Sequence, residues 1–207
     1  MLYALADWLS NWFSPFNAFT YLTSRVIFGA LTALLLSIGF GGRMIALLRR
    51  LQMGQYVRDD GPQTHLKKAG TPTMGGALII LSVCIAMLLW ADLRIKYTWI
   101  ALFVMLGFGA VGWIDDYRKL ILKDPQGLRA KHKYALLSLV SFLTAVWLYL
   151  SAASPVETTL IVPFLKDLSW NMGWIFIPFV YFVLTGASNA VNLTDGLDGL
   201  AIMPVVL

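Results

Sequence analysis

The sequence has few charged residues and a single cysteine, and both shortages restrict the class of protein. Charged side chains make up 13% of the 207 residues and hydrophobic ones 58%, which excludes an ordinary soluble domain. Cys84 has no second cysteine to pair with, so an intramolecular disulfide is excluded. Walker A spacing is also missing, which excludes that nucleotide-binding motif.

Long apolar runs lie between the charged segments. A helix needs about 20 apolar residues to cross the roughly 30 Å hydrocarbon core of a membrane. The sequence predicts five complete spans, at about Leu22–Phe40, Met74–Ala91, Tyr97–Ile114, Tyr134–Ser151 and Met172–Val191. A sixth begins near Gly199 and is cut off at Leu207. We therefore expect an all-α, polytopic integral membrane protein with a single membrane domain over residues 1–207.

Two segments outside these spans have a predicted structure of their own. The first, Met1–Phe19, is rich in aromatic residues and lacks the basic start and small-residue cleavage site of a signal peptide. We expect it to form an interfacial helix, with Trp8 and Trp12 at headgroup depth. The second, Thr158–Val162, is bounded by prolines and predicts a short strand or hairpin.

Basic residues are concentrated in two of the loops between the spans. The loop Arg43–Lys68 and the loop after Ile114 each carry six lysines or arginines, whereas the other two loops carry two and one. The positive-inside rule therefore places both basic loops in the cytoplasm and the N-terminus outside. This topology, with contacts to anionic headgroups, accounts for most of the net charge of +5. Nucleic acid is not an expected partner.

Asp115 and Asp116 stand side by side where the apolar run Tyr97–Ile114 ends. At the C-terminus of a helix the macrodipole disfavours each anion by about 0.3–1 kcal/mol, and adjacent like charges add to that cost. A divalent metal ion facing a phosphate would offset the charge. The simpler interpretation is a solvated helix end neutralised by Arg118 and Lys119. The dipeptide alone leaves both interpretations open.

Further polar groups belong to the same predicted side of the membrane. Asp195 and Asp198 are three residues apart, so they would share one face of a helical turn. Gly196 and Gly199 allow a close approach of the backbone to a ligand. Asn, Asp and Gly are also common in turns and helix caps, which is the alternative interpretation. The ladder of oxygen ligands of a calcium loop is missing, and His65 has no cysteine partners for zinc.

These segments together predict carboxylates, amides and lysines at one membrane face. Mg²⁺ prefers one or two carboxylates and completes its shell with substrate phosphate oxygens. The pattern therefore favours phosphoryl transfer to a lipid-borne acceptor. A transporter or channel would need charged or broken helices at mid-membrane, and none is evident. A non-catalytic membrane scaffold would leave the acidic face without a purpose.

Several motifs, in this order, resemble the phospho-N-acetylmuramoyl-pentapeptide transferase family of polyprenyl-phosphate N-acetylhexosamine-1-phosphate transferases. They are Asp59–Pro62, His65, Lys68, Gly70–Gly76, Ile114–Lys119 and Asn189–Leu200. The resemblance implies transfer of phospho-MurNAc-pentapeptide to undecaprenyl phosphate, giving lipid I and UMP in the first membrane step of peptidoglycan synthesis. A sister family that moves GlcNAc-1-phosphate shares the Asp-Asp and Asp-Gly-x-Asp-Gly elements, but Gly70–Gly76 and Asn192–Asp195 resemble the muramoyl branch more closely.

The resemblance also implies roles for individual residues. Asp115 and Asp116 would be the catalytic carboxylates and the ligands of Mg²⁺, one of them acting as a base toward the lipid phosphate in a one-step or two-step mechanism. The residues expected to bind substrate are Lys68, Thr73, Asn192, Asp195, Gly196, Leu197 and Asp198.

The resemblance further implies where the protein lies and what it meets. The expected partners are UDP-MurNAc-pentapeptide, undecaprenyl phosphate and membrane lipid, with a homodimer as the candidate assembly. The expected location is the bacterial inner membrane, with the active site facing the cytoplasm. Family members have more membrane helices and a later catalytic aspartate, so we expect these 207 residues to be inactive alone.

Overall fold

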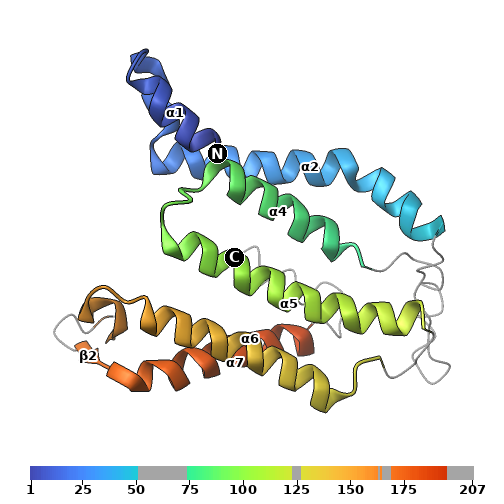
Figure 1. Cartoon of the computed structure of the whole chain (residues 1–207). Helices are drawn as coiled ribbons and strands as arrows, with labels where there is room; N and C mark the ends of the chain where they lie inside the picture. Colours follow the sequence, from blue (N-terminus) through green and yellow to red (C-terminus); the bar gives the residue numbers. More distant parts are fainter. Residues whose placement is uncertain (51–73, 123–126, 163, 165–168, 195–207) are drawn as a thin grey trace. The chain divides into compact units, whose positions relative to one another are not determined.

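The computed structural model describes residues 1–50, 74–122, 127–162, 164 and 169–194, and these residues are mostly helical. The elements in chain order are α1 (Leu2–Ser10), the 3₁₀ helix η1 (Ser14–Phe19), α2 (Leu22–Arg50), α4 (Gly76–Trp90), α5 (Lys96–Leu120), α6 (Ala130–Leu150), η2 (Pro155–Thr158), β1 (Thr159–Ile161), β2 (Ser169–Asn171), η3 (Gly173–Ile175) and α7 (Phe176–Thr194) (Figure 1). They form two compact units, Met1–Lys133 and Tyr134–Leu207. The single membrane domain stays a prediction.

The all-α membrane class is confirmed. Four stretches of helix in the described residues are long and apolar enough to cross a membrane: Leu22–Arg50, Lys96–Lys119, Ala130–Leu150 and Gly173–Asn192. The predicted span Met74–Ala91 is the shorter helix α4, with 15 residues. At 1.5 Å per residue α4 is about 22 Å long, less than the roughly 30 Å core. The number of spans and the outward N-terminus therefore stay predictions, and the segment from Gly199 lies outside the described residues.

The segments that the sequence predicts as basic loops are partly helical. Helix α2 continues past Phe40 to Arg50, and α5 continues through both aspartates to Leu120. Helix α6 already begins at Ala130. Lysine and arginine are good helix formers and are favoured near a helix C-terminus, so these helices do not end where the apolar run ends. The placement of Arg43–Arg50 in a loop was therefore wrong.

In the first unit, α4 lies between α2 and α5 (Figure 1). Near one end of α4 the Phe28 and Trp90 rings stack at 5.1 Å, and Trp90 Nε1 donates a hydrogen bond of 2.9 Å to Thr32 Oγ1. Near the other end Leu48 of α2 packs against Met74, the residue before Gly75 and α4. The pair α2–α4 is therefore fixed at both ends, which holds the start of α4 beside the basic end of α2.

The N-terminal segment is not one continuous helix. Helix α1 ends at Ser10, and η1 follows with a proline in its first turn. An ion pair of 3.2 Å between Arg94 and Asp7 ties α1 to the turn between α4 and α5. The predicted interfacial position of this segment stays a prediction.

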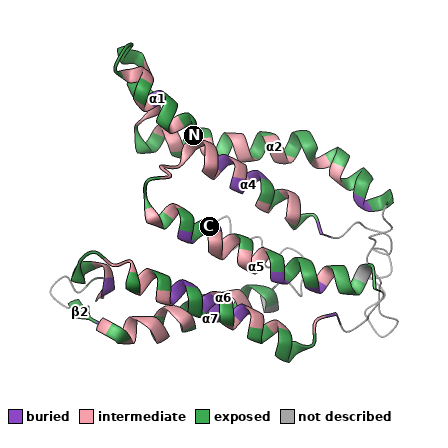
Figure 2. Cartoon of the chain, viewed as in Figure 1, coloured by how far each residue is buried: buried purple, intermediate pink, exposed green. Residues whose placement is uncertain are grey.

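The second unit contains α6, α7 and the strands between them. Strands β1 and β2 pair antiparallel, with Leu160 opposite Trp170, so the predicted hairpin is confirmed. Buried residues are few in both units and lie mainly on the faces where helices meet, as Figure 2 shows. Most large apolar side chains are exposed, which suits helices surrounded by lipid.

Candidate functional site

Asp115 is buried near the end of α5 and accepts three hydrogen bonds. Only 5% of its surface is exposed. Its Oδ2 accepts from Lys119 Nζ at 2.8 Å and from Lys133 Nζ at 3.3 Å. Its Oδ1 accepts from the backbone N–H of Leu128 at 2.8 Å. Two ammonium groups and one backbone dipole therefore offset the charge of this carboxylate, which burial would otherwise make very costly.

The chain turns back toward Asp115 at Gly127. Gly127 has φ +60, a left-handed conformation that glycine adopts without strain. A Cβ at this position would lie 2.6 Å from Asp115 Oδ1 and 2.6 Å from Lys119 Cε. Only glycine therefore fits without displacing Asp115 or Lys119, and this backbone places the next N–H, that of Leu128, on Oδ1.

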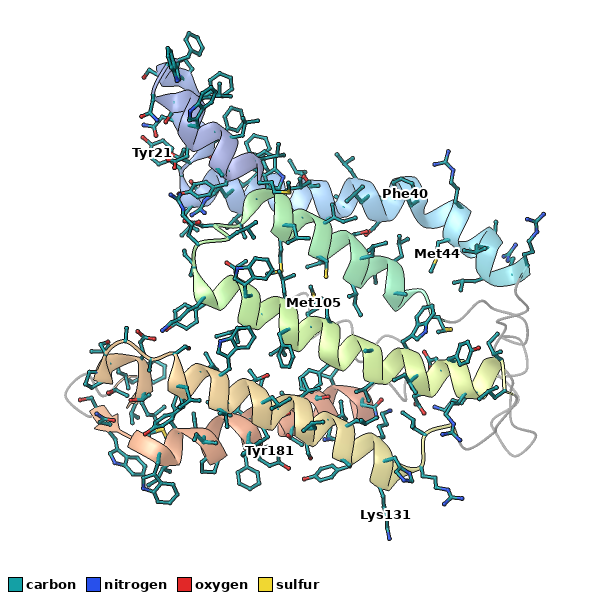
Figure 3. All side chains as sticks on the ribbon, in the orientation of Figure 1. Tyr21, Phe40, Met44, Met105, Lys131 and Tyr181 are labelled. Carbon is teal, nitrogen blue, oxygen red and sulfur yellow. The ribbon has the colours of Figure 1, made fainter. Side chains whose placement is uncertain are left out.

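Lys133 was missed as a site residue, because in the sequence it served only as one of the topology-setting charges. Lys131, His132 and Lys133 stand in the first turn of α6, where the macrodipole disfavours cations, just as it disfavours aspartates at the end of α5. The ion pair between Asp115 and Lys133 offsets both disfavoured charges. Cations at the start of one helix and carboxylates at the end of the preceding helix could therefore have indicated this ion pair from the sequence. Lys131 differs from Lys133, since it is exposed and points outward from α6 (Figure 3).

Asp116 has a different environment from its neighbour. It is half-buried. Within the described part of the chain no hydrogen bond or ion pair engages its carboxylate, and Lys119 and Lys133 act on it only through their charge. The simpler interpretation, a solvated helix end neutralised by Arg118 and Lys119, is confirmed for the ion pair between Lys119 and Asp115. It is wrong about solvation, because Asp115 is buried and is also bound by Lys133 and Leu128.

The two carboxylates differ in how well they fit a metal ion. Mg²⁺ takes one or two carboxylates and completes its shell with water and phosphate oxygens. Among the described residues no donor bonds to either oxygen of Asp116, so Asp116 fits this role. Both oxygens of Asp115 already accept hydrogen bonds, and two of these three bonds come from lysine ammonium groups. Among the described residues no cluster of three or more His, Cys, Asp or Glu forms a ready-made metal cage.

The remaining predicted site residues are described only in part. Lys68, Thr73, Asp195, Gly196, Leu197 and Asp198 lie outside the described residues. Asn192 is exposed near the end of α7. Asn189, one turn earlier, donates from Nδ2 to the Thr185 carbonyl at 2.8 Å. The structure therefore brings Lys119, Lys133 and Leu128 to Asp115, and it places Asn189 and Asn192 on the second unit.

Met74 belongs to the Gly70–Gly76 motif and has a structural role that sequence reasoning did not assign. It has φ +70, which is rare for a residue with a side chain, and it is buried. Its side chain packs against Leu48, with Met44 beside them. Figure 3 shows Met44 on the side of α2 that faces α4. Such strained backbone persists where surrounding contacts hold it, and it is common beside functional sites.

The membrane-length helices define a polytopic membrane protein. The acidic pair at the end of one of these helices, with lysines around one carboxylate, forms a charged site. Comparison with known proteins gives the family. Residues 98–207 match the model of glycosyl transferase family 4, and the chain belongs to that family. Residues 68–80 match phospho-N-acetylmuramoyl-pentapeptide-transferase signature 1.

A named relative is similar over the whole chain. All 207 residues align, at 73% identity, with the phospho-N-acetylmuramoyl-pentapeptide-transferase of Dichelobacter nodosus (strain VCS1703A). The chain spans 58% of the length of that relative. The resemblance seen in the motifs is therefore confirmed. Asp115, Asp116 and Gly127 all lie within the part that matches the family model, and Met74 lies within the signature.

Proposed function

We propose that the full-length protein containing this chain transfers phospho-MurNAc-pentapeptide from UDP-MurNAc-pentapeptide to undecaprenyl phosphate. A phosphate oxygen of the lipid attacks the β-phosphorus of the donor, the bond from that phosphorus to the bridging oxygen breaks, and UMP leaves with that oxygen. The products are lipid I and UMP. The identity of 73% to a relative with this name is the observation that carries the proposal, and the match to signature 1 supports it.

The pair Asp115–Asp116 divides the work in this proposal. Asp116, whose oxygens accept no hydrogen bond within the described residues, would hold Mg²⁺, which would offset charge that develops on the diphosphate. Asp115 anchors Lys119 and Lys133. Each ammonium has three N–H donors, so both lysines keep donors for phosphate oxygens while they hold Asp115. We also propose that Asp115 binds the metal ion. This would require Lys119 or Lys133 to release its hydrogen bond to Asp115 Oδ2.

The proposed substrates indicate which side of the membrane the site faces. A UDP-linked donor is made in the cytoplasm, so we propose that the ends of α5 and α7 face the cytoplasm of a bacterial inner membrane. Asn192, Asp195, Gly196, Leu197 and Asp198, together with Lys68 and Thr73, are proposed to bind the uridine and sugar phosphate. Assembly as a homodimer stays a prediction.

The test uses the full-length protein purified in detergent. With UDP-MurNAc-pentapeptide, undecaprenyl phosphate and Mg²⁺ we expect lipid I and stoichiometric UMP, and we expect chelation with EDTA to abolish both. UDP-GlcNAc in place of the donor tests the sister activity, GlcNAc-1-phosphate transfer, and we expect no product from it. Transfer from UDP-GlcNAc alone would establish the sister activity. No product from either donor, in a protein with normal thermal unfolding, would contradict a catalytic role.

A further inference from the structure

Helices α6 and α7 meet through hydroxyl groups in the middle of apolar segments. Thr185 Oγ1 donates to Ser141 Oγ at 3.0 Å, and Ser141 Oγ donates to the Leu137 carbonyl at 2.9 Å. Ser141 is fully buried, and Thr185 is 5% exposed. Figure 2 shows buried residues where the two helices lie against each other. A hydroxyl pair is therefore enclosed between two helices that are mainly apolar and long enough to cross a membrane.

The same two helices share a second polar contact one turn away. The Tyr181 hydroxyl of α7 lies 3.0 Å from Ser138 Oγ and 3.2 Å from the Tyr134 hydroxyl, both of α6. Tyr181 is labelled in Figure 3, on α7. Spacings of three and four residues put these side chains on one face of each helix. We call the set Tyr134, Ser138, Ser141, Tyr181 and Thr185 the polar seam.

The polar seam leads toward the motif at the end of α7. Asn189 is one turn beyond Thr185, and its Nδ2 donates to the Thr185 carbonyl at 2.8 Å. Asn189 begins the run Asn189–Leu200, in which Asn192 is the first residue proposed to bind the donor. Hydrogen bonds therefore connect α6, through Ser141 and Thr185, to the turn that precedes Asn192.

In a membrane, apolar packing alone does not fix the rotation of such a helix. Lipid tails are as apolar as leucine side chains, so turning α7 about its axis gains or loses little hydrophobic free energy. A shift of one residue turns a helix by about 100° and moves it by about 1.5 Å. Such a shift would break the hydrogen bond from Thr185 to Ser141, and the Thr185 hydroxyl would lose this buried partner.

We propose that Thr185 and Ser141 are positioning residues, whose hydrogen bond fixes the rotation and axial register of α7 so that Asn192 and the residues after it meet the UDP-linked donor. This inference rests on the proposed function. It gives the hydrogen bond between Thr185 and Ser141, which lies within the apolar spans, a role in donor binding. Loss of the contact is expected to weaken donor binding more than it slows the chemical step, since Asp115 and Asp116 are on a different helix.

The chain offers a matched control in Thr144. This threonine is also buried in α6, with 1% exposure, and its hydroxyl donates at 2.8 Å to Val140 O of the same helix. Thr144→Val and Thr185→Val remove the same atom from equally buried sites. Thr185→Ser keeps the hydroxyl and is the variant expected to restore function. Ser141→Ala removes the acceptor instead of the donor.

Kinetics of the full-length variants test the positioning role. We expect Thr185→Val and Ser141→Ala to raise the KM for UDP-MurNAc-pentapeptide by up to about tenfold, with kcat within about threefold of the wild type. Thr144→Val and Thr185→Ser should keep the wild-type KM. A Thr185→Val variant that loses thermal stability while its KM stays unchanged would overturn the proposal and leave the seam a purely structural contact.

A second readout needs no turnover. Spin labels on Ala135→Cys and Ala190→Cys, both exposed positions of the second unit, report the arrangement of α6 and α7 in a background where Cys84 and every other cysteine of the full-length protein are replaced by alanine. We expect Thr185→Val to shift or broaden the distance distribution and Thr144→Val to leave it unchanged. If the wild type transfers nothing, the proposed function fails while this measurement still decides the positioning of α7. An identical distribution in both variants would overturn the inference.

Discussion

Lys133 Nζ lies 3.3 Å from Asp115 Oδ2, and the two residues are 18 positions apart in the chain. This contact joins the end of α5 to the start of α6. It turns the first aspartate of the pair into the centre of a small charge network, with Lys119 as the second cation. Asp116, the next residue, is outside that network. Neighbouring carboxylates of identical chemistry therefore have different environments.

The first prediction separates the two aspartates. Asp115→Asn and Asp116→Asn should each reduce UMP release by the full-length protein at least about a hundredfold, because loss of a charge in a desolvated site costs a few kcal/mol. Only Asp115→Asn should also lower the thermal unfolding midpoint, because it leaves Lys119 and Lys133 without their counter-charge. Asp92→Asn, which removes a carboxylate paired with Arg94, is the control and should keep activity. Equal thermal stability of the two site variants would contradict the division.

The second prediction concerns Lys133. Lys133→Met keeps the length of the side chain and removes the ammonium, so Asp115 loses one of its two cations. We expect a loss of stability of about 1–2 kcal/mol, moderated because the lysine is partly exposed, and a reduced rate of transfer. Lys131→Met removes an outward-pointing lysine of the same helix turn and should change neither quantity. Thermal unfolding in detergent and UMP release measure the two effects, and equal behaviour of both variants would exclude a role for Lys133.

The third prediction tests the turn at Gly127. Gly127→Ala adds a Cβ that would lie 2.6 Å from Asp115 Oδ1 in a left-handed backbone conformation. We expect transfer to fall at least about tenfold, because Asp115 or Lys119 must move. Gly112→Ala is the matched control in α5, where a Cβ would meet nothing within 4 Å, and alanine favours the helix by about 0.5–1 kcal/mol. Normal transfer by Gly127→Ala would show that the site tolerates a displaced turn.

The fourth prediction concerns topology. In intact cells, in a background where Cys84 and every other cysteine of the full-length protein are replaced by alanine, Ile95→Cys and Val156→Cys should react with a membrane-impermeant thiol reagent. Leu122→Cys, and a cysteine near Gly61, should react only after the cells are opened, since the basic segments are expected inside. All three described positions are exposed, so a lack of reaction reports the side of the membrane and not burial. Reaction of Leu122→Cys in intact cells would place the aspartates on the side without a UDP-linked donor.

Local properties of the sequence were enough to predict the class of protein and much of its plan. Apolar runs predicted the helices α2, α5, α6 and α7, because the length and composition of a span are set by the membrane core. Prolines around a β-prone run predicted the hairpin of β1 and β2. The helix ends were less predictable: charged residues after Phe40 and Ile114 continue the helices, since lysine and arginine form helices well outside the core.

The sequence by itself determined the family motifs and the presence of two adjacent carboxylates at the end of an apolar run. Tertiary structure decided which partners those carboxylates have. Lys133 reaches Asp115 only because the chain reverses at Gly127, and Thr185 meets Ser141 only because two separate helices come together. Hydropathy and helical periodicity describe each helix alone, whereas a hydrogen bond between helices depends on their relative rotation, to which apolar patterns in a membrane are nearly indifferent.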